Sequence, residues 1–354
     1  MLHCGLVRRL LSIIAAAAIS AAAAAAGSAD ANAAQPRYSY GQVSQGAKVV
    51  LRTGQALPGF TGGALAATDG ETVTVYTEDT LLAADSTLNQ HWADTLTTLL
   101  HGTEIADVTL YVATLQRLQQ ICGSGALGCY DPSSRTIIGL GEDIRGITPQ
   151  AVITHEYGHH LANSRNNDPW PAVDWGTKRW ASYENVCRRS KAGELVPGDE
   201  GQFYQQNPGE LFAEDYRVLN ERRLGLAETS WGVVDSSLYP SQGALDALAQ
   251  DVATPWAGNM TTAYSGLMTA RASGRGFRLT TPYDGTFATT LTAPPNSRFT
   301  LRVVDLGTGR VLASVAGAQR VKTARVALCG ERALQVQVKR VAGSGAFTLS
   351  VSKA

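Results

Sequence analysis

Two histidines four residues apart, His155 and His159, enclose Glu156 within an apolar stretch of the chain. The apolar residues recur at helical intervals, and residues four apart on an α-helix share a face. The two imidazoles can therefore bind one metal ion, while Glu156 projects towards a neighbouring face. This arrangement suits Zn²⁺ with a carboxylate beside its water. The spacing predicts a zinc centre, against the alternative of a chance match.

A catalytic zinc ion takes three protein ligands, so a third side chain has to come from elsewhere. A third histidine six residues beyond His159 is excluded, because that position is Arg165. Asp168 and Asp174 follow in the next loop, but neither has the sequence context of an aspartate ligand. The better candidates lie further along the chain.

Glu210 and Glu214 stand four residues apart in residues 207–217, on one face of a predicted helix. Asn207 suits the N-cap of that helix and Pro208 its first position. Glu210 could then reach back to the cap amide, but capping explains one glutamate and not the pair. From the residues alone, either glutamate is a candidate for the third ligand.

The sequence Glu-Leu-Phe-Ala-Glu at residues 210–214 lies downstream of His-Glu-x-x-His. This combination resembles the motifs of the lethal-factor branch of the gluzincin peptidases. The resemblance covers the two active-site helices. It implies a zincin-like fold, a Zn²⁺ cofactor and hydrolysis of peptide bonds. It also implies that Glu210 is the third ligand and that Glu214 orients His155.

The same resemblance implies a hydrogen-bond donor for the tetrahedral intermediate, a tyrosine shortly before the glutamate ligand. Tyr204 is the candidate, although the family spacing would fall on Phe203; plain packing is the alternative role for Tyr204. It further implies an edge strand that holds the substrate backbone. Residues 136–140, just before the motif helix, are the candidate for that strand.

Glu156 is expected to be the general base of this site. A carboxylate can take a proton from the activated water and give it to the leaving amine. His160 projects about 100° away from His159 around the helix, so we expect it to pack or to support the site rather than to bind the metal.

The first 33 residues have the pattern of a secretory signal peptide. Arg8 and Arg9 precede an apolar run, and Ala31-Asn32-Ala33 provides a small-residue cleavage site. We therefore expect a secreted or envelope protein without stable membrane insertion, against the alternative of a retained signal anchor.

Four cysteines follow the signal segment, an even number in a chain expected to be exported. The glycine-rich loop between Cys122 and Cys129 favours a local disulfide. Cys187 and Cys329 would then form a second bridge between two domains. The alternative is that these two remain buried free thiols.

The remaining pattern predicts an α+β fold: a zincin-like catalytic domain over residues 34–272, with a twisted sheet and active-site helices, and a small all-β sandwich over residues 273–354. Strands are expected around residues 49–51, 72–76, 108–112 and 136–140, and helices over 81–100, 178–189, 208–223 and 241–252. The tail alternates apolar and polar residues, and it resembles the pre-peptidase C-terminal domains of exported bacterial proteases.

The formal net charge of the whole chain is zero, and no basic block is interleaved with aromatic residues. We therefore expect a protein or peptide substrate and no nucleic-acid partner, and the sequence gives no oligomeric state. The expected function is a secreted zinc endopeptidase. The alternatives are a catalytically silent binding or adhesion protein on the same scaffold, and a zinc hydrolase of a non-peptide amide.

Overall fold

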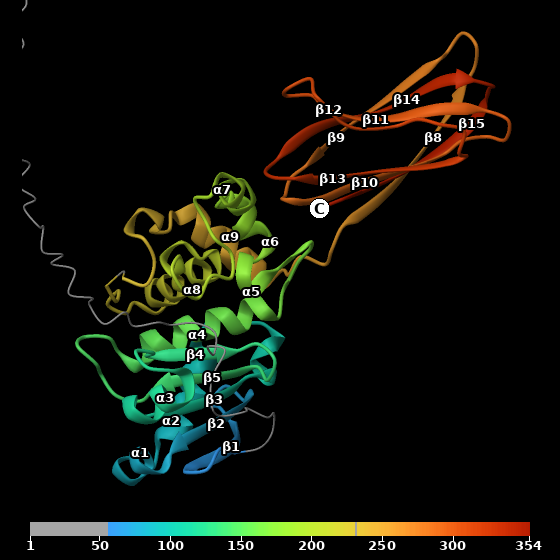
Figure 1. Ribbon diagram of the computed structural model, residues 1–354. Coiled ribbons are helices and arrows are strands. Elements are labelled where there is room, and N and C mark those ends of the chain that lie inside the picture. The colour runs from blue at the N-terminus through green and yellow to red at the C-terminus, as the bar shows by residue number, and fades with distance from the viewer. Residues whose placement is uncertain (1–55, 231) are drawn as a thin grey trace, which may run out of the picture. The chain divides into compact units, whose positions relative to one another are not determined.

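The computed structural model describes residues 56–230 and 232–354, so the predicted signal segment and the strand at residues 49–51 lie outside the described residues. An α+β domain with a mixed sheet is followed by an all-β domain of two sheets (Figure 1). This confirms the predicted fold class. Below, the N-terminal domain denotes residues 56–259 and the sandwich domain residues 260–354.

The sheet of the N-terminal domain has five strands in the order β1-β2-β3-β5-β4. Their bounds are Phe60–Ala66 for β1, Thr72–Glu78 for β2, Thr109–Ala113 for β3, Gly128–Asp131 for β4 and Thr136–Leu140 for β5. Strands β2, β3 and β5 are parallel, whereas β1 pairs antiparallel with β2 and β4 antiparallel with β5. Strand β3 is wholly buried, as expected for a strand with neighbours on both sides.

The prediction that residues 136–140 form the edge strand is wrong. Strand β5 lies inside the sheet, between β3 and β4, and β4 forms the edge. A short turn at residues 132–135 folds β4 back onto β5, so Gly128 pairs with Gly139 and Asp131 with Thr136. The glycine-rich approach to β4 hid this strand, because it carries no alternating apolar pattern.

Two helices carry the metal motif residues, and each begins with a capping side chain followed by a proline. The helix α4 covers Pro149–Asn163, and its N-cap Thr148 accepts a hydrogen bond from the Ala151 amide. The helix α8 covers Pro208–Leu224, and its N-cap Asn207 accepts one from the Gly209 amide. These caps fix where each helix starts, and hence which residues face its neighbour.

The helix α4 lies between the sheet and α8. A Cβ added at Gly139 of β5 would lie 2.3 Å from Ile153 Cγ1, so the helix packs closely on the strand. The remaining helices of this domain are α1 (Asp79–Ala84), α2 (Leu88–Thr98), α3 (Leu115–Cys122), α5 (Ala172–Trp175), α6 (Lys178–Tyr183), α7 (Val186–Ala192) and α9 (Gln242–Ala253), with short 3₁₀ turns including η2 (Tyr204–Gln206). The predicted helix over 178–189 is broken at Asn185, which has a left-handed backbone.

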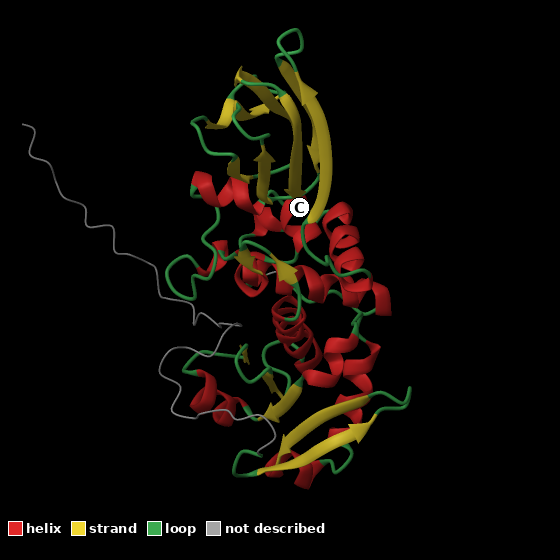
Figure 2. Ribbon diagram, turned by 90° about the vertical axis from the view of Figure 1, so that its right-hand side faces the viewer, coloured by secondary structure: helices red, strands yellow, loops and turns green. Residues whose placement is uncertain are grey.

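The sandwich domain consists of two antiparallel sheets, and its described elements are strands only (Figure 2). One sheet has the order β13-β10-β15-β8, and the other has the order β12-β11-β14-β9. The bounds are Met260–Met268 for β8, Gly274–Thr281 for β9, Gly285–Thr292 for β10, Arg298–Asp305 for β11, Val311–Val315 for β12, Val321–Leu328 for β13, Arg332–Ala342 for β14 and Gly345–Lys353 for β15. Strand β8 pairs with β15 along its whole length. The sheet therefore includes residues 260–268, which precede the expected start of the sandwich at residue 273.

Both predicted disulfides are present, Cys122–Cys129 and Cys187–Cys329. The second links α7 to the residue that follows β13. Buried Lys178 of α6 adds a polar link between the two domains. Its Nζ donates to the carbonyl oxygens of Asp168 in the N-terminal domain, at 2.7 Å, and of Asp284 in the sandwich domain, at 3.0 Å. Among the described residues, no helix is long and apolar enough to cross a membrane.

Candidate metal centre

Three side chains from the two central helices meet in the interior of the N-terminal domain. His155 and His159 come from α4 and Glu210 comes from α8, and all three are at most 1% exposed. Their ligand atoms lie within 4.8 Å of one another. His155 Nε2 is 3.2 Å from Glu210 Oε2, and His159 Nε2 is 3.4 Å from Glu210 Oε1. The predicted ligands therefore form a group that could hold a metal ion.

The spacing and polarity of this group fit a zinc ion. Bonds of about 2.0 to 2.1 Å in a tetrahedral site place ligand atoms about 3.3 to 3.5 Å apart. Within the described part of the chain, neither ring nitrogen of His159 nor Glu210 Oε1 makes a hydrogen bond, although all are buried. Buried polar atoms without hydrogen bonds are costly, and a cation bound between them would satisfy two of these three atoms.

Glu214 lies one turn beyond Glu210 and holds His155 from the opposite side of the ring. His155 Nδ1 donates to Glu214 Oε2 at 2.9 Å, so Nε2 is the ring nitrogen that faces Glu210. The Arg217 guanidinium donates to both oxygens of Glu214, at 3.0 and 2.8 Å. Arg217 also pairs with Glu221, whose carboxylate accepts from Thr229. A buried chain of charges therefore fixes the orientation of His155.

These contacts change the pKa values of the site. Burial lowers the pKa of His155, but hydrogen bonds and charge from Glu210 and Glu214 outweigh it and raise the pKa to about 10. Burial raises the pKa of Glu210, but the two histidines outweigh it and lower the pKa to about 2. The pKa of Glu214 falls to about 2, since hydrogen bonds from His155 and Arg217 outweigh the burial. The carboxylates are therefore anionic at neutral pH, as metal ligation and its support require.

Tyr204 of η2 lies beside this group. Its hydroxyl donates to Glu210 Oε2 at 2.6 Å. Burial, and next the charge of Glu210, raise the pKa of Tyr204 well above its ordinary value, so the phenol remains protonated. Phe203, on which the family spacing would fall, is 42% exposed and has no hydroxyl group.

Glu156 is fully buried and lies against the edge strand. A Cβ added at Gly128, the first residue of β4, would lie 2.5 Å from Glu156 Oε1 and 2.8 Å from Val152 Cγ1. Gly128 therefore leaves the space that this carboxylate occupies. The sequence motif gave no indication of this glycine, because its importance depends on the position of β4.

The other acidic and histidine candidates lie elsewhere. His160 faces away from the ligand group, donates from Nε2 to the Glu104 carbonyl at 2.9 Å and lies 3.2 Å from the Tyr130 hydroxyl. Asp168 lies in the loop after α4, and its backbone carbonyl accepts a hydrogen bond from Lys178 Nζ. Asp174 lies beside Gly198. None of the three belongs to the ligand group of the described residues.

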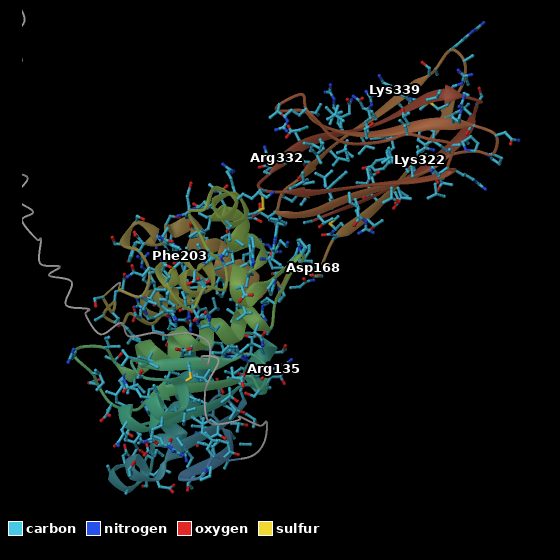
Figure 3. The ribbon with its side chains drawn as sticks, viewed as in Figure 1. Arg135, Asp168, Phe203, Lys322, Arg332 and Lys339 are labelled. Atoms are coloured by element: carbon cyan, nitrogen blue, oxygen red, sulfur yellow. A yellow bond between two sulfur atoms is a disulfide. The ribbon has the colours of Figure 1, made fainter. Side chains whose placement is uncertain are left out.

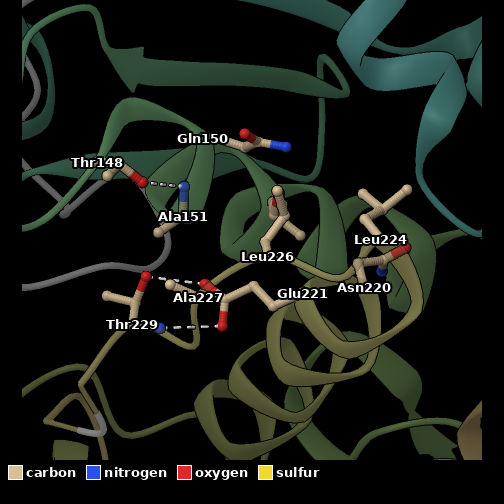
Figure 4. Close-up of a pocket in the computed structure, with 10 residues that line it drawn as sticks. Thr148, Gln150, Ala151, Asn220, Glu221, Leu224, Leu226, Ala227 and Thr229 are labelled. Atoms are coloured by element: carbon tan, nitrogen blue, oxygen red, sulfur yellow. Dashed lines mark hydrogen bonds between the residues drawn. The ribbon is translucent and has the colours of Figure 1, made fainter.

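A pocket of about 190 Å³ lies between the N-terminal turns of α4 and the C-terminal turns of α8 (Figure 4). Ala151, Thr154 and Glu221 are among its lining residues. Ala151 lies one helical turn before His155 on the same face, about 6 Å along the axis. The pocket therefore lies about one helical turn from His155 along α4, and its lining residues do not include the three candidate ligands.

Comparisons with protein-family models and with curated proteins give no match. Among solved structures, the chain is similar to the pre-peptidase C-terminal domain of a Bacillus anthracis collagenase, with 14% identity over 26% of this chain and 89% of that chain and a TM-score of 0.24. It is also similar to a Yersinia pseudotuberculosis-derived mitogen, with 9% identity over 27% of this chain and 87% of that chain and a TM-score of 0.22.

Proposed function

We propose that this chain is a zinc-dependent endopeptidase whose metal ligands are His155, His159 and Glu210. The single observation that carries the proposal is the buried ligand group, with Glu156 next to two of its members on α4. A zinc ion held there would supply a Lewis acid for a carbonyl oxygen and lower the pKa of a water molecule.

The side chains around the group have the chemistry that amide hydrolysis needs. Glu156 would accept the proton of the attacking water at its carboxylate and deliver it to the leaving nitrogen. The Tyr204 hydroxyl, protonated because of its raised pKa, would exchange its hydrogen bond to Glu210 Oε2 for one to the oxyanion of the substrate. Glu214 and Arg217 would hold the His155 ring in position.

The edge strand supports a peptide as the substrate. Strand β4 forms the end of the sheet, and its first residue lies against Glu156. An extended peptide paired with such an edge gains main-chain hydrogen bonds, and its carbonyl groups would pass beside the general base. A hydrolase of a non-peptide amide would not need this edge, so we rank that alternative second.

Export is part of the same proposal. Two disulfides, Cys122–Cys129 and Cys187–Cys329, suit an oxidising compartment. The N-terminal pattern of residues 1–33 supports a signal peptide that directs the chain there.

A peptide-library digest of the zinc-loaded protein tests the function, with Glu156→Gln as the matched variant. We expect cleavage of internal peptide bonds by the wild type, none after chelation, and less than about 1% of the activity in Glu156→Gln with zinc still bound. Activity on amide substrates without cleavage of any peptide would favour the non-peptide hydrolase. Stoichiometric zinc without turnover in either screen would favour the silent binding protein.

A further inference from the structure

The zero net charge of the chain conceals two domains of opposite charge. Residues 56–259 contain 12 Lys and Arg and 26 Asp and Glu, a formal charge of −14. Residues 260–354 contain 13 Lys and Arg and 3 Asp and Glu, a formal charge of +10. A domain of this size with such an excess of cations attracts anionic partners over several ångströms at physiological salt.

The acidic residues of the sandwich domain do little to neutralise its surface. Asp284 and Asp305 are buried, and Glu331 is the one exposed acid. Some of the cations have partners within the domain. Arg332 Nη1 lies 3.8 Å from Asp305 Oδ2. Arg340 donates to the Gly343 carbonyl, and buried Lys322 donates to the Gln319 carbonyl. Other cations of the domain remain available to an external anion.

One sheet face gathers three such cations. Arg278 of β9, Arg302 of β11 and Lys339 of β14 are exposed, and none makes an ion pair within the described part of the chain. Their neighbours along each strand, such as Leu301, Val303 and Val338, point into the core. We call the outer side of the sheet β12-β11-β14-β9 around these three cations the basic face; Figure 3 labels Lys339 on it.

The strand register places the three cations close together on the basic face. Arg302 pairs with Gln337, and Lys339 stands two residues further along β14, roughly 7–8 Å away on the diagonal. Arg278 pairs with Gln335, on the other side of β14. The three charges therefore surround two amide side chains, and Gln337 donates to Gln335 at 2.7 Å.

A glycine lies within the basic face. On β9 the outward position opposite Gln337 is Gly276, and a Cβ there would lie 2.6 Å from Gln335 Nε2. The amide of Gln335 therefore lies over the glycine. Polar and cationic side chains spread over three neighbouring strands suit an extended polymer better than a compact ligand.

We propose that the basic face binds a linear acidic polysaccharide that carries carboxylates. The arginine guanidiniums match carboxylates in two-pronged pairs, and the glutamine amides match sugar hydroxyls. The acidic N-terminal domain repels the same polymer, so binding is confined to the sandwich domain. The face has no aromatic side chain for stacking bases, because Phe277 and Phe299 point inward, where each contacts Phe347.

The experiment uses the full chain and measures binding to polygalacturonate by calorimetry at several salt concentrations. The variant is Arg278→Gln, Arg302→Gln and Lys339→Gln together. The control is Arg310→Gln, Arg320→Gln and Arg325→Gln, which removes the same charge from exposed positions of the same domain outside strands β9, β11 and β14. Equal melting temperatures of the three proteins show that each one folds.

We expect salt-sensitive binding by the wild type, a loss of roughly tenfold or more in the basic-face variant and less than about threefold in the control. Neutral dextran should not bind. The proposal is overturned if polygalacturonate does not bind, or if both variants lose affinity equally. It is also overturned if polyglutamate, double-stranded DNA or phosphatidylglycerol vesicles bind as tightly, or if the same residues drive self-association with the acidic domain of a second copy.

Discussion

Gly158 of α4 lies directly against Ala213 of α8: a Cβ added at Gly158 would lie 2.7 Å from the Ala213 Cα. The two helices can come this close because the glycine has no side chain. The contact lies within one turn of the ligands on both helices, between His155 and His159 on α4 and between Glu210 and Glu214 on α8. The distance between the histidines and the glutamates therefore depends on this contact.

Gly158→Ala should therefore weaken zinc binding by roughly tenfold or more, although residue 158 touches no metal. Alanine is better than glycine in a helix interior by about 1 kcal/mol, so helix propensity alone predicts a gain in stability. The backbone of α8 opposes the added methyl and has to move. Zinc titration of the metal-free protein measures the effect. Gly63→Ala is the control, because nothing lies within 4 Å of that position, and equal affinity in both variants would refute the role of the contact.

Glu210 and Glu214 should differ sharply when each is replaced. In the proposed site, Glu210→Ala removes one of three metal ligands and should abolish stoichiometric zinc. Glu214→Ala removes only the partner of His155 Nδ1 and should weaken affinity by roughly 10–100-fold. Metal analysis after gel filtration measures both variants. Loss of zinc in Glu214→Ala, with retention in Glu210→Ala, would reverse the two roles.

Zinc uptake at pH 7 should release about one proton from His155. In the metal-free protein the pKa of His155 is raised to about 10, so the imidazole holds its proton at pH 7. Ligation needs the neutral ring, so that proton must leave, and affinity should increase with pH towards about 10. Calorimetry in buffers of different ionisation enthalpy counts the protons. Uptake with no proton release would show that His155 is not the residue that loses its proton.

Replacing Cys187 and Cys329 together by serine should separate the melting of the two domains. The bridge closes a loop with a sequence separation of 142, for which the chain-entropy relation gives about 4 to 5 kcal/mol. Each domain has its own buried core, so both domains should still fold. The hydrogen bond from Lys178 to the Asp284 carbonyl remains between them. Scanning calorimetry should show two transitions in place of one. A single transition at the wild-type temperature would exclude the coupling.

The metal group could be predicted from the sequence because helix geometry acts over short distances. The spacing of His155 and His159, and of Glu210 and Glu214, places each pair on one face whatever the rest of the fold does. The disulfides followed from cysteine count and loop composition. The expectation that these two helices face each other comes instead from the resemblance to gluzincins.

Features that depend on long-range pairing were not predictable in the same way. The edge position of β4 is set by its pairing with β5, and the space beside Glu156 follows from Gly128 on that strand. An arginine side chain is usually exposed to solvent. Arg217, however, is buried between Glu214 and Glu221. The opposite charges of the two domains cancel in the net charge of the whole chain, so that sum does not reveal them.

The central claim is that His155, His159 and Glu210 bind zinc and that Glu156 transfers the proton. The most direct test is the zinc content and peptidase activity of the purified protein beside Glu156→Gln. The account predicts one zinc per chain in both proteins and hydrolysis by the wild type alone, since Glu156 is not a ligand. Absence of zinc from a metal-replete wild type, or a Glu156→Gln variant that retains zinc and more than a few per cent of the activity, would contradict it.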